Sequence, residues 1–488
     1  MKKILMLTSE TVPYAKTGGL ADVVTALAIE LKRLGHDVRV LMPRYYHIDR
    51  SSLKRHDSAL GIWLGSGEEW TAVYEGHLPG TEVPVYFLDH ERFFGRDGIY
   101  GARPDDGFED NAARYSLLAR GAFQLCRMLH WFPDIIHAHD WPAAPACYLL
   151  KKEEGHREFS KTRSVLTIHN LGYQGIFALN DAVYLQPELD VLNLSTIEYS
   201  GAFNFLKAGI MTADKITTVS PTYAEEIKRP EYGFGMDGLL RYRERDLRGI
   251  INGIDYSIWN PETDEYISPN NFSADNIRNK KLVKKDLQKK AGLKAAANVP
   301  LVGIVTRLVD QKGIKELCAP GSGALFSICS DFNIQFVILG SGDSWCEKEL
   351  NSLSSKLPNL SVKIGYDNHF AHLIEAGSDF FLMPSRYEPC GLNQLYSLSY
   401  GTLPIVRRTG GLADTVENYD METGGGTGFL FDDLRPDVLY DVLKWVVETW
   451  EQRMPDILAM RKRAMEKRFA WESSAQEYLE VYSQALKH

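Results

Sequence analysis

Apolar residues along the first half of the chain follow two spacings, one typical of buried strands and one typical of amphipathic helices. Short β-branched runs predict strands, and between several of them apolar residues recur every three or four positions, as at Val24, Leu27 and Leu31. Alternation of strands and helices favours an α/β fold with a parallel, doubly wound sheet. We expect the strands at residues 4–7, 38–42, 135–136, 165–168 and 216–219.

A second series of the same kind begins at Pro300 and predicts a second Rossmann-like domain. Turn-forming residues at 252–255 and 259–261 separate the two series and indicate a linker. We therefore expect an N-terminal domain over residues 1–255, a C-terminal domain over 256–466, and a final helix at 467–488 that crosses back onto the first domain. The strands of the second series are expected at residues 302–305, 336–339, 362–364, 380–383 and 405–406.

Two further segments stand out from these series. Residues 70–88 contain Leu78-Pro79-Gly80 at their centre and predict an added β-hairpin. Residues 280–290 are rich in lysine and predict a helix with a solvated basic face.

Composition narrows the class of protein. The chain has 488 residues, 44% of them hydrophobic and 24% charged, which is typical of a globular protein with more than one domain. Its net charge of -9 argues against a general nucleic-acid or membrane binder. No apolar run is long enough to cross a bilayer, and the six cysteines include no Cys-x-x-Cys pair. We expect a cytoplasmic protein.

A short string occurs twice, near opposite ends of the chain. Lys-Thr-Gly-Gly-Leu-Ala-Asp at residues 16–22 recurs as Arg-Thr-Gly-Gly-Leu-Ala-Asp at residues 408–414. A cation, a hydroxyl and two glycines before a helical pattern suit either a tight turn or a helix N-terminus that binds an anion. We expect the copies to differ, with Lys16, Gly18 and Gly19 binding a ligand and Thr409 and Gly410 shaping the floor beside Glu388.

Polar residues follow the predicted strands in both halves. In an open parallel sheet, ligands bind beyond the carboxyl ends of the strands. Both domains carry cations and glycines at that edge, so a cleft between the facing domains is expected to bind a charged, phosphorylated ligand. The residues after the strands include Asp140, His169 and Asn170 in the first half and Arg307, Lys312, Tyr366 and Glu388 in the second.

Three residues of the second half suggest diphosphate chemistry. Arg307 and Lys312 are suited to neutralise a departing diphosphate, Arg by forking two oxygens and Lys as a point charge. Glu388, in a stiff turn before a helix, is suited to bind sugar hydroxyls or to face a developing positive charge. The plainer interpretations are a surface pair of cations and a carboxylate that favours the start of the helix.

A metal site is not predicted. His137, His139 and Asp140 lie close in sequence, but alternate strand residues point to opposite faces, so the two histidines and Asp140 diverge unless the strand has ended. No Asp-x-Asp occurs, so cations are expected to replace the metal of metal-dependent sugar transferases. A Gly-x-Gly-x-x-Gly match at residues 233–238 follows no apolar strand and predicts a loop rather than a dinucleotide site.

The motifs taken together resemble the bacterial glycogen synthase and starch synthase family, retaining glucosyltransferases of GT-B architecture. The resemblance covers almost the whole chain in the same order. It includes Lys-Thr-Gly-Gly-Leu at residues 16–20, His-Ala-His-Asp-Trp at 137–141, His-Asn-Leu at 169–171, Phe-Leu-Lys-Ala-Gly at 205–209, Gln-Lys-Gly at 311–313, Glu-Pro-Cys-Gly-Leu at 388–392 and Tyr-Gly-Thr-Leu-Pro at 400–404.

The resemblance implies transfer of glucose from ADP-glucose to the non-reducing end of an α-1,4-glucan, with retained configuration, no metal and no cofactor. It implies that Arg307 and Lys312 hold the diphosphate and that Glu388 contacts the donor glucose. The implied donor-binding residues are Lys16, Gly18, Gly19, Tyr366, Cys390, Gly391, Leu392, Asn393, Thr409 and Gly410; Asp140 and His169 join the catalytic set, and Tyr100, Asn170 and Asn252 bind sugar or acceptor.

Two positions depart from the family pattern. Asn393 stands where the family commonly has Thr, so a side-chain contact to phosphate would differ there. Residues 318–323, Cys-Ala-Pro-Gly-Ser-Gly, interrupt a helix that is regular in the family, and their Pro and Gly predict a shortened or kinked helix.

Three other functions compete with this one. Another GT-B transferase using UDP-glucose, or a sugar-nucleotide epimerase, shares the two-domain plan. A nucleotide-sugar-binding regulator without turnover would keep the binding residues. A dinucleotide oxidoreductase comes last, because the chain has no strand-linked fingerprint.

Overall fold

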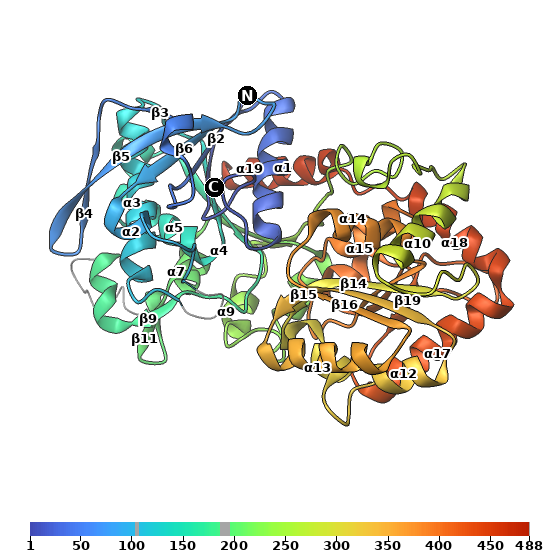
Figure 1. The fold of residues 1–488 in the computed structure, drawn as a ribbon. Helices are drawn as coiled ribbons and strands as arrows, with labels where there is room; N and C mark the ends of the chain where they lie inside the picture. The colour runs from blue at the N-terminus through green and yellow to red at the C-terminus, as the bar shows by residue number, and fades with distance from the viewer. Residues whose placement is uncertain (103–106, 186–195, 488) are drawn as a thin grey trace. The chain divides into compact units, whose positions relative to one another are not determined.

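The structure, a computed structural model, describes residues 1–102, 107–185 and 196–487. It divides into two compact units (Figure 1). Unit 1 contains Met1–Gly253 together with Trp471–His488, and unit 2 contains Ile254–Ala470. The chain thus passes between the units at 253–254 and 470–471, whereas the sequence pattern suggests 255–256 and 466–467.

One sheet runs through unit 1, in the order β13-β12-β8-β7-β1-β2-β6-β5-β3, with β4 beside β5. The strands from β13 to β6 are parallel, and β3, β4 and β5 are antiparallel to their neighbours. The five strands predicted for this half correspond to β1, β2, β7, β8 and β12. The bounds are β1 Lys3–Leu7, β2 Asp37–Pro43, β3 Lys54–Arg55, β4 Leu60–Leu64, β5 Gly67–His77, β6 Pro84–Asp89, β7 Ile135–His139, β8 Arg163–Ile168, β12 Lys215–Thr218 and β13 Leu247–Gly249.

Two expectations for this sheet need correction. The hairpin at residues 70–88 exists as β5 and β6, but it is not an addition, because β6 pairs in parallel with β2 inside the main sheet. Strand β7 continues through His139, three residues beyond the predicted end. Its histidines remain in the strand because they are buried and hydrogen-bonded, with His137 Nε2 2.6 Å from Thr167 Oγ1 on β8.

The helices of unit 1 alternate with these strands along the chain. A small second sheet of β9 Ile176–Ala178, β10 Glu198–Tyr199 and β11 Ala202–Asn204 lies before α7. The helices are α1 Gly19–Arg33, α2 Glu91–Phe94, α3 Asn111–Met128, α4 Asp140–Ala143, α5 Pro145–Leu149, α7 Phe205–Thr212, α8 Pro221–Glu226, α9 Asp237–Tyr242 and α19 Trp471–Ala485.

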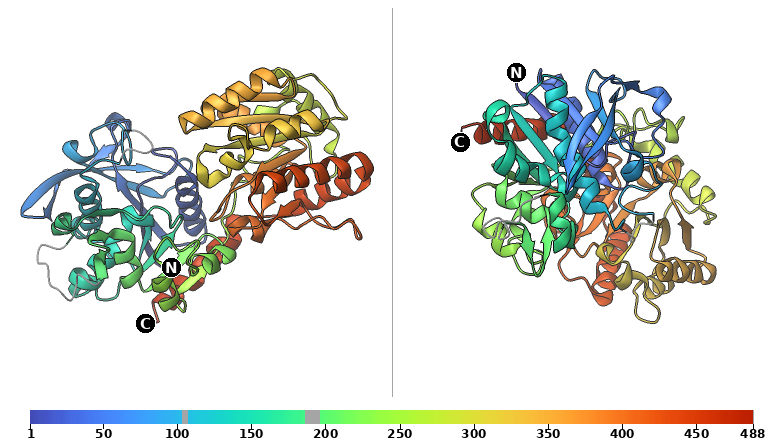
Figure 2. Two further views of the ribbon diagram at one scale, coloured as in Figure 1. Left: turned by 90° about the horizontal axis from the view of Figure 1, so that it is seen from below. Right: turned by 90° about the vertical axis from the view of Figure 1, so that its left-hand side faces the viewer.

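The C-terminal helix α19 belongs to unit 1, although the preceding 217 residues belong to unit 2. Figures 1 and 2 show the C-terminal end of the chain among the N-terminal elements. Helix α19 packs against α1, β8 and β12. Its Tyr482 is fully buried, and the hydroxyl lies 2.8 Å from His137 Nδ1. A buried hydrogen bond of this kind fixes the helix to the strand β7.

The sheet of unit 2 is parallel throughout, in the order β16-β15-β14-β17-β18-β19. Its strands are buried on both faces, because successive residues enter two different hydrophobic clusters. Val302 and Ile304 pack with α11, α12, α13, α17 and α18, whereas Leu301 packs with α10 and α14. This two-sided burial explains why the strands appear in the sequence as continuous apolar runs.

The five strands predicted for this half correspond to β14–β18, and β19 was not predicted. Its apolar run is only three residues long and follows a glycine-rich loop at 424–428. The bounds are β14 Leu301–Leu308, β15 Gln335–Gly342, β16 Leu360–Ile364, β17 Phe380–Met383, β18 Leu403–Arg407 and β19 Phe429–Phe431; α10 Lys280–Lys290, α11 Ile314–Cys318, α12 Leu325–Asp331, α13 Ser344–Lys356, α14 Asn368–Gly377, α15 Asn393–Ser399, α16 Gly410–Thr415, α17 Pro436–Gln452 and α18 Met454–Glu466.

Helix α10 has the expected solvated basic face, since Lys281, Lys285, Lys289 and Lys290 are exposed, but its other two lysines are buried. Lys280 is 2% exposed and donates to Ala376 O at 2.7 Å and Thr402 Oγ1 at 2.6 Å. Lys284 is equally buried and pairs with Asp379 at 2.6 Å, and Arg461 pairs with the same carboxylate. Both lysines are paired with buried acceptors, which is the condition for burying a cation.

The predicted break after Lys312 is confirmed. Helix α11 ends at Cys318, and α12 begins only at Leu325.

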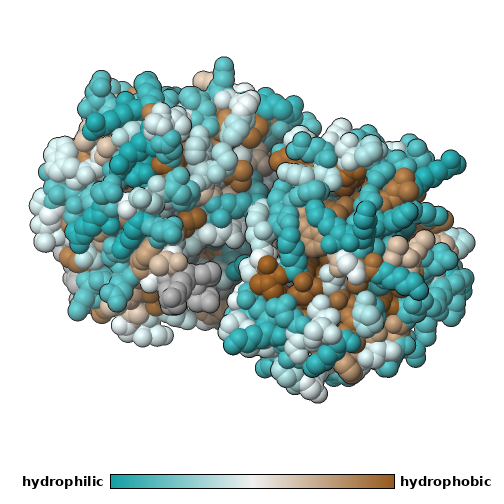
Figure 3. Space-filling model, viewed as in Figure 1, coloured by the Kyte–Doolittle hydropathy of each residue, from teal (hydrophilic) through white to brown (hydrophobic). Residues whose placement is uncertain are grey.

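Hydrophobic side chains show in small separate patches on the face seen in Figure 3. Among the helices that the structure describes, none is long and apolar enough to span a bilayer.

Candidate active site

The loop after β1 carries the first copy of the repeated string, and a buried carboxylate holds it. Glu10 is 2% exposed and accepts hydrogen bonds from the Thr17 backbone N–H at 2.5 Å and from the Thr17 hydroxyl at 2.7 Å. The Tyr100 hydroxyl donates to the same carboxylate at 2.5 Å. Glu10 therefore fixes the Lys16 loop to Tyr100. Glu10 was not among the predicted site residues, although it follows the buried strand β1 closely, as several predicted site residues follow their strands.

Helix α1 begins directly behind this loop. Gly18 is the N-cap and Gly19 the first helical residue, and no side chain caps the first turn. A Cβ atom on Gly18 would meet nothing within 4 Å, so the approach to these backbone N–H groups is open. Lys16 is half exposed and pairs with Asp22 at 2.8 Å. The cation therefore lies at the positive end of the helix.

The ends of β7 and β8 bring Asp140, His169 and Asn170 together. Asp140 follows the last strand residue, with a left-handed φ of 57° that is unfavourable for a residue with a side chain. Its Oδ1 accepts the backbone N–H of His169 at 2.7 Å and that of Asn170 at 3.4 Å. Burial raises the pKa of Asp140 to about 7. The carboxyl group can therefore hold or release a proton near neutrality.

The histidines of this region form a neutral cluster. His139 Nδ1 lies 3.0 Å from His169 Nε2, and the His137 and His139 rings are 4.1 Å apart between centroids. Burial lowers the pKa of His137 and His169 to about 3, and that of His139 well below its usual value. These side chains thus act as uncharged hydrogen-bonding groups at pH 7.

Tyr100 joins the loop after β1 to the end of β7. Its hydroxyl also lies 2.7 Å from Ser9 Oγ, and its ring lies 5.9 Å from that of Trp141, which follows Asp140. The predicted residues Lys16, Tyr100, Asp140, His169 and Asn170 therefore form one connected group.

Asn252 follows β13, at the same end of the sheet as His169, because β8, β12 and β13 are parallel. The side chain is 4% exposed. Its Oδ1 is buried without a hydrogen-bond partner among the described residues, so it retains an acceptor for a bound group.

In unit 2 an ion pair lies at the strand ends. Lys312 Nζ donates to Glu388 Oε2 at 2.6 Å, and the Ser385 hydroxyl donates to the same oxygen at 2.8 Å. Both charged side chains are largely buried. A Cβ atom on Gly313 would collide with Pro384 O, so the glycine after Lys312 allows the segment after β14 to lie against the segment after β17. This close approach produces the pair.

Arg307 is exposed at the end of β14 and donates to Gln311 Oε1 at 3.2 Å. Gln311 in turn donates to Tyr387 O at 3.3 Å, beside Glu388. The three predicted residues Arg307, Lys312 and Glu388 are thereby brought together. Arg386, by contrast, is paired with Asp310 and Glu316.

The second copy of the repeated string packs against the turn that carries Glu388. The Gly411 N–H donates to Glu388 O at 3.1 Å and Pro389 O at 3.2 Å. Gly410 has a φ of 45°, and a Cβ atom there would collide with Glu388 O. Thr409 is buried as the N-cap of α16. The second copy thus packs against the Glu388 turn, as expected, and ligand binding by either copy stays a prediction.

Residues 390–393 lead from this floor into α15. Cys390 is buried, and Gly391 has a φ of 74°, a conformation suited to glycine. Leu392 is the N-cap, and Asn393 begins the helix. The Asn393 side-chain amide donates to Val305 O on β14 at 2.9 Å. The residue that departs from the family pattern therefore ties α15 to the strand of Arg307.

Tyr366 follows β16 and is 82% exposed. Its hydroxyl lies 3.3 Å from Asn368 Oδ1. The ring is accessible for stacking, and its contact with adenine stays a prediction.

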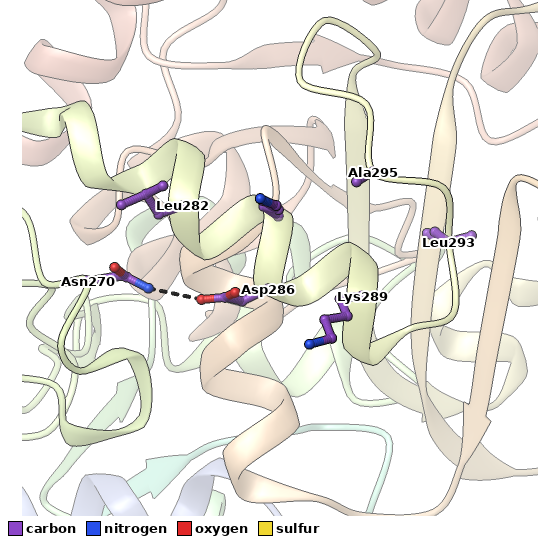
Figure 4. Close-up of a pocket in the computed structure, with 7 residues that line it drawn as sticks. Asn270, Leu282, Asp286, Lys289, Leu293 and Ala295 are labelled. Atoms are coloured by element: carbon purple, nitrogen blue, oxygen red, sulfur yellow. Dashed lines mark hydrogen bonds between the residues drawn. The ribbon is translucent and has the colours of Figure 1, made fainter.

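Two other features do not coincide with the predicted residues. A pocket lies beside α10 and is lined by Asn270, Leu282, Lys285, Asp286, Lys289, Leu293 and Ala295 (Figure 4). In it Asn270 donates to Asp286 at 2.9 Å, and no predicted site residue lines it. Within the part of the chain that is described, no three His, Cys, Asp or Glu side chains are grouped to hold a metal ion.

Comparisons with known proteins cover the full chain. Residues 3–242 match the family model of the starch synthase catalytic domain, and residues 285–463 match glycosyl transferases group 1. The chain is 55% identical to a glycogen synthase of Treponema denticola over 99% of both chains, and 44% identical to glycogen synthase 1 of Geobacter metallireducens over 99% of this chain and 96% of that one.

Solved structures agree with these relatives. The catalytic domain of starch synthase IV from Arabidopsis thaliana, bound to ADP and acarbose, superimposes with a TM-score of 0.90 at 30% identity and full coverage of both chains. Sucrose-phosphate synthase from Thermosynechococcus elongatus, at 16% identity and a TM-score of 0.60 over both full chains, shares the fold. The chain therefore belongs to the glycogen synthase and starch synthase family and is a glycosyltransferase of GT-B architecture.

Proposed function

We propose that the protein is a glycogen synthase that transfers glucose from ADP-glucose to the non-reducing end of an α-1,4-glucan with retention of configuration. The pairing of Lys312 with Glu388, beside Arg307 at the strand ends of unit 2, is the observation that carries this proposal. The related starch synthase bound to ADP and acarbose supports the choice of donor and of acceptor class.

Charge stabilisation of the leaving diphosphate explains the need for Arg307 and Lys312. Negative charge builds up on the diphosphate as it leaves. Hydrogen-bond donors that are already fixed in position stabilise this charge without any rearrangement of the site. Arg307 would fork two phosphate oxygens, and Lys312 would supply a point charge. With the diphosphate bound, Lys312 would lie between the phosphate and Glu388, and the carboxylate would accept hydrogen bonds from the donor glucose.

The connected group of unit 1 would bind sugar hydroxyls. We assign Lys16, Gly18 and Gly19 to the donor, through the cation and the open N-terminus of α1. Asp140, His169, Asn170, Asn252 and Tyr100 are suited to glucose and acceptor hydroxyls, because they offer mostly uncharged donors and acceptors. Exclusion of water by these groups would favour transfer over hydrolysis of the donor.

Retention is proposed to occur without an enzyme nucleophile. The departing phosphate would take the proton of the acceptor hydroxyl on the face from which it leaves, so the new bond forms on that same face. Glu388 would then stabilise positive charge at the anomeric carbon without bonding to it. A covalent glucosyl adduct on Glu388, trapped during turnover and found by mass spectrometry, would replace this mechanism by double displacement.

The proposed cellular setting is the cytoplasm. All six cysteines are buried and free of disulfides, as expected in a reducing compartment.

A donor comparison tests the proposal. The purified protein is incubated with a short maltooligosaccharide and radiolabelled ADP-glucose, UDP-glucose or UDP-N-acetylglucosamine. We expect label in the glucan from ADP-glucose, and much less from the uridine nucleotides. Transfer only from a uridine nucleotide would indicate another GT-B transferase, and binding without transfer would indicate a regulator.

A further inference from the structure

Two tryptophans lie exposed on the β4–β5 hairpin, far along the sheet from the strand ends of the proposed site. Trp63 on β4 is 55% exposed and Trp70 on β5 is 63% exposed. The hairpin lies at the edge of the sheet of unit 1 (Figure 1). Such large aromatic side chains are usually buried, so a pair of them exposed to solvent indicates a binding surface.

The strand register puts both rings on the same face of the hairpin. Gly61 is opposite Trp70, and Trp63 is opposite Glu68. Residues two apart on a strand share a face, so the two tryptophans are diagonal neighbours, close enough to be spanned by one extended ligand.

The opposite face of the hairpin is part of the core. Leu60, Ile62 and Leu64 alternate with the exposed positions and are buried, and β4 packs on α3. The fold of the hairpin therefore depends on that inner face, and the two rings are not needed to fill it.

A carboxylate lies beside one of the two rings. The Glu68 side chain folds over Gly61, where a Cβ atom would collide with Glu68 Oε1 and lie 3.4 Å from Trp70 Cη2. The missing side chain of Gly61 thus lets the carboxylate lie beside Trp70. On the same face, two residues further along β5, Asp89 is opposite Ala72, and its buried carboxylate pairs with Arg44 at 2.6 Å and with Arg50 at 2.8 Å. Arg50 also reaches the exposed Glu91 at 2.5 Å.

We propose that the face formed by Trp63, Glu68 and Trp70, here called the tryptophan face, is a second binding site for an α-glucan chain. The C–H groups on one side of a glucose ring fit the negative face of an indole, and carboxylates and guanidinium groups accept and donate to the hydroxyls at the rim. The inference rests on the proposed function, which supplies a neutral, polyhydroxylated polymer as the ligand that this protein handles.

Size and charge favour a glucan over other occupants. Two tryptophans offer at most about 500 Å², well short of the about 800 Å² per partner of a standard protein interface. The carboxylate of Glu68, which is exposed on this face opposite Trp63, disfavours phosphate-bearing polymers and anionic lipid surfaces. Binding here would hold the enzyme on a branched polymer and raise the local concentration of chain ends.

Affinity electrophoresis in native gels with increasing glycogen tests the proposal. We expect W63A/W70A to raise the apparent Kd for glycogen about tenfold, equivalent to about 1.4 kcal/mol, while its activity on a short maltooligosaccharide stays within about twofold of wild type. W63F/W70F keeps aromatic rings and should retain most of the binding. The matched control is Trp345→Ala, which removes a 39% exposed tryptophan from α13 in unit 2 and should leave the retardation unchanged.

Three outcomes separate the hypotheses. Equal retardation of wild type and W63A/W70A would refute the site, as would the same loss in Trp345→Ala. Glycogen retardation that depends on the two tryptophans, in a protein that transfers no glucose, would refute the proposed function and leave the site standing. Thermal unfolding of each variant tests whether weaker binding comes from loss of the fold. We expect the wild-type Tm in each hairpin variant, because the buried inner face of the hairpin is unchanged.

Discussion

The two copies of the repeated string respond differently to the same substitution. Gly411→Ala adds a methyl group that would collide with Cys390 O and lie 2.5 Å from Cys390 Cα, so the two backbones have to move apart by about 1 Å. Gly18→Ala, in the Gly-Gly turn of the first copy but at the position that aligns with Gly410, adds a methyl group with nothing within 4 Å, on extended backbone that alanine adopts easily.

The size of the effect follows from the backbone contact. Overpacking of this kind costs about 1–3 kcal/mol, which lowers the Tm of a domain the size of unit 2 by about 2–4 °C per kcal/mol. Because the displaced turn carries Glu388, we also expect kcat of Gly411→Ala to fall about 100-fold, as for a displacement of about 1 Å in a catalytic group. Gly18→Ala should keep the wild-type Tm within about 1 °C.

Scanning calorimetry and steady-state transfer to a short maltooligosaccharide measure both quantities. Two results would contradict this prediction: a Gly411→Ala protein with the wild-type Tm and kcat, or a Gly18→Ala protein that is the less stable of the two. Either result would mean that the second copy does not support the Glu388 turn.

Three further predictions concern charge, pH and metal. Lys312→Ala should lower kcat about 10²- to 10³-fold, and Lys312→Arg should recover only part of the lost activity. Steady-state kinetics measure both variants. A change confined to KM would contradict a role of Lys312 in stabilising the leaving group. Burial holds the pKa of His137 at about 3, so its neutral form contributes stability above pH 6.5 that is lost as the pH falls towards 3. Between pH 7 and pH 5 the free energy of unfolding should fall by about 2 kcal/mol through this residue. Urea unfolding at the two pH values should show that His137→Asn removes this contribution. Equal acid sensitivity of the wild type and His137→Asn would contradict the effect of burial. Glucosyl transfer should persist in excess EDTA. Loss of transfer in EDTA, with recovery on adding a divalent metal ion, would show that Arg307 and Lys312 do not replace a metal.

Local patterns were enough to predict the sheets and much of the site. Both sheets are buried at their centres, so their strands show as apolar runs in the sequence, and the residues after them are candidates for binding. The break between α11 and α12 followed from Pro320 and Gly321, because their backbone preferences act locally.

Features that depend on distant partners were missed or wrong. Lys280 is buried because it finds Ala376 O and Thr402 Oγ1, about 100 residues away in the sequence, and helix periodicity carries no trace of such acceptors. Glu10 is important through Thr17 and Tyr100, and the second of these lies 90 residues away. Strand β7 extends through two histidines because Thr167 and Tyr482 satisfy His137.

The most direct test of glucosyl transfer is to follow a defined maltooligosaccharide by mass spectrometry while ADP release is measured in the same reaction. The proposed function predicts a ladder of products, each longer by one glucose, with one ADP released for each glucose added. Release of ADP and free glucose without longer products, or no release of ADP at all, would contradict it.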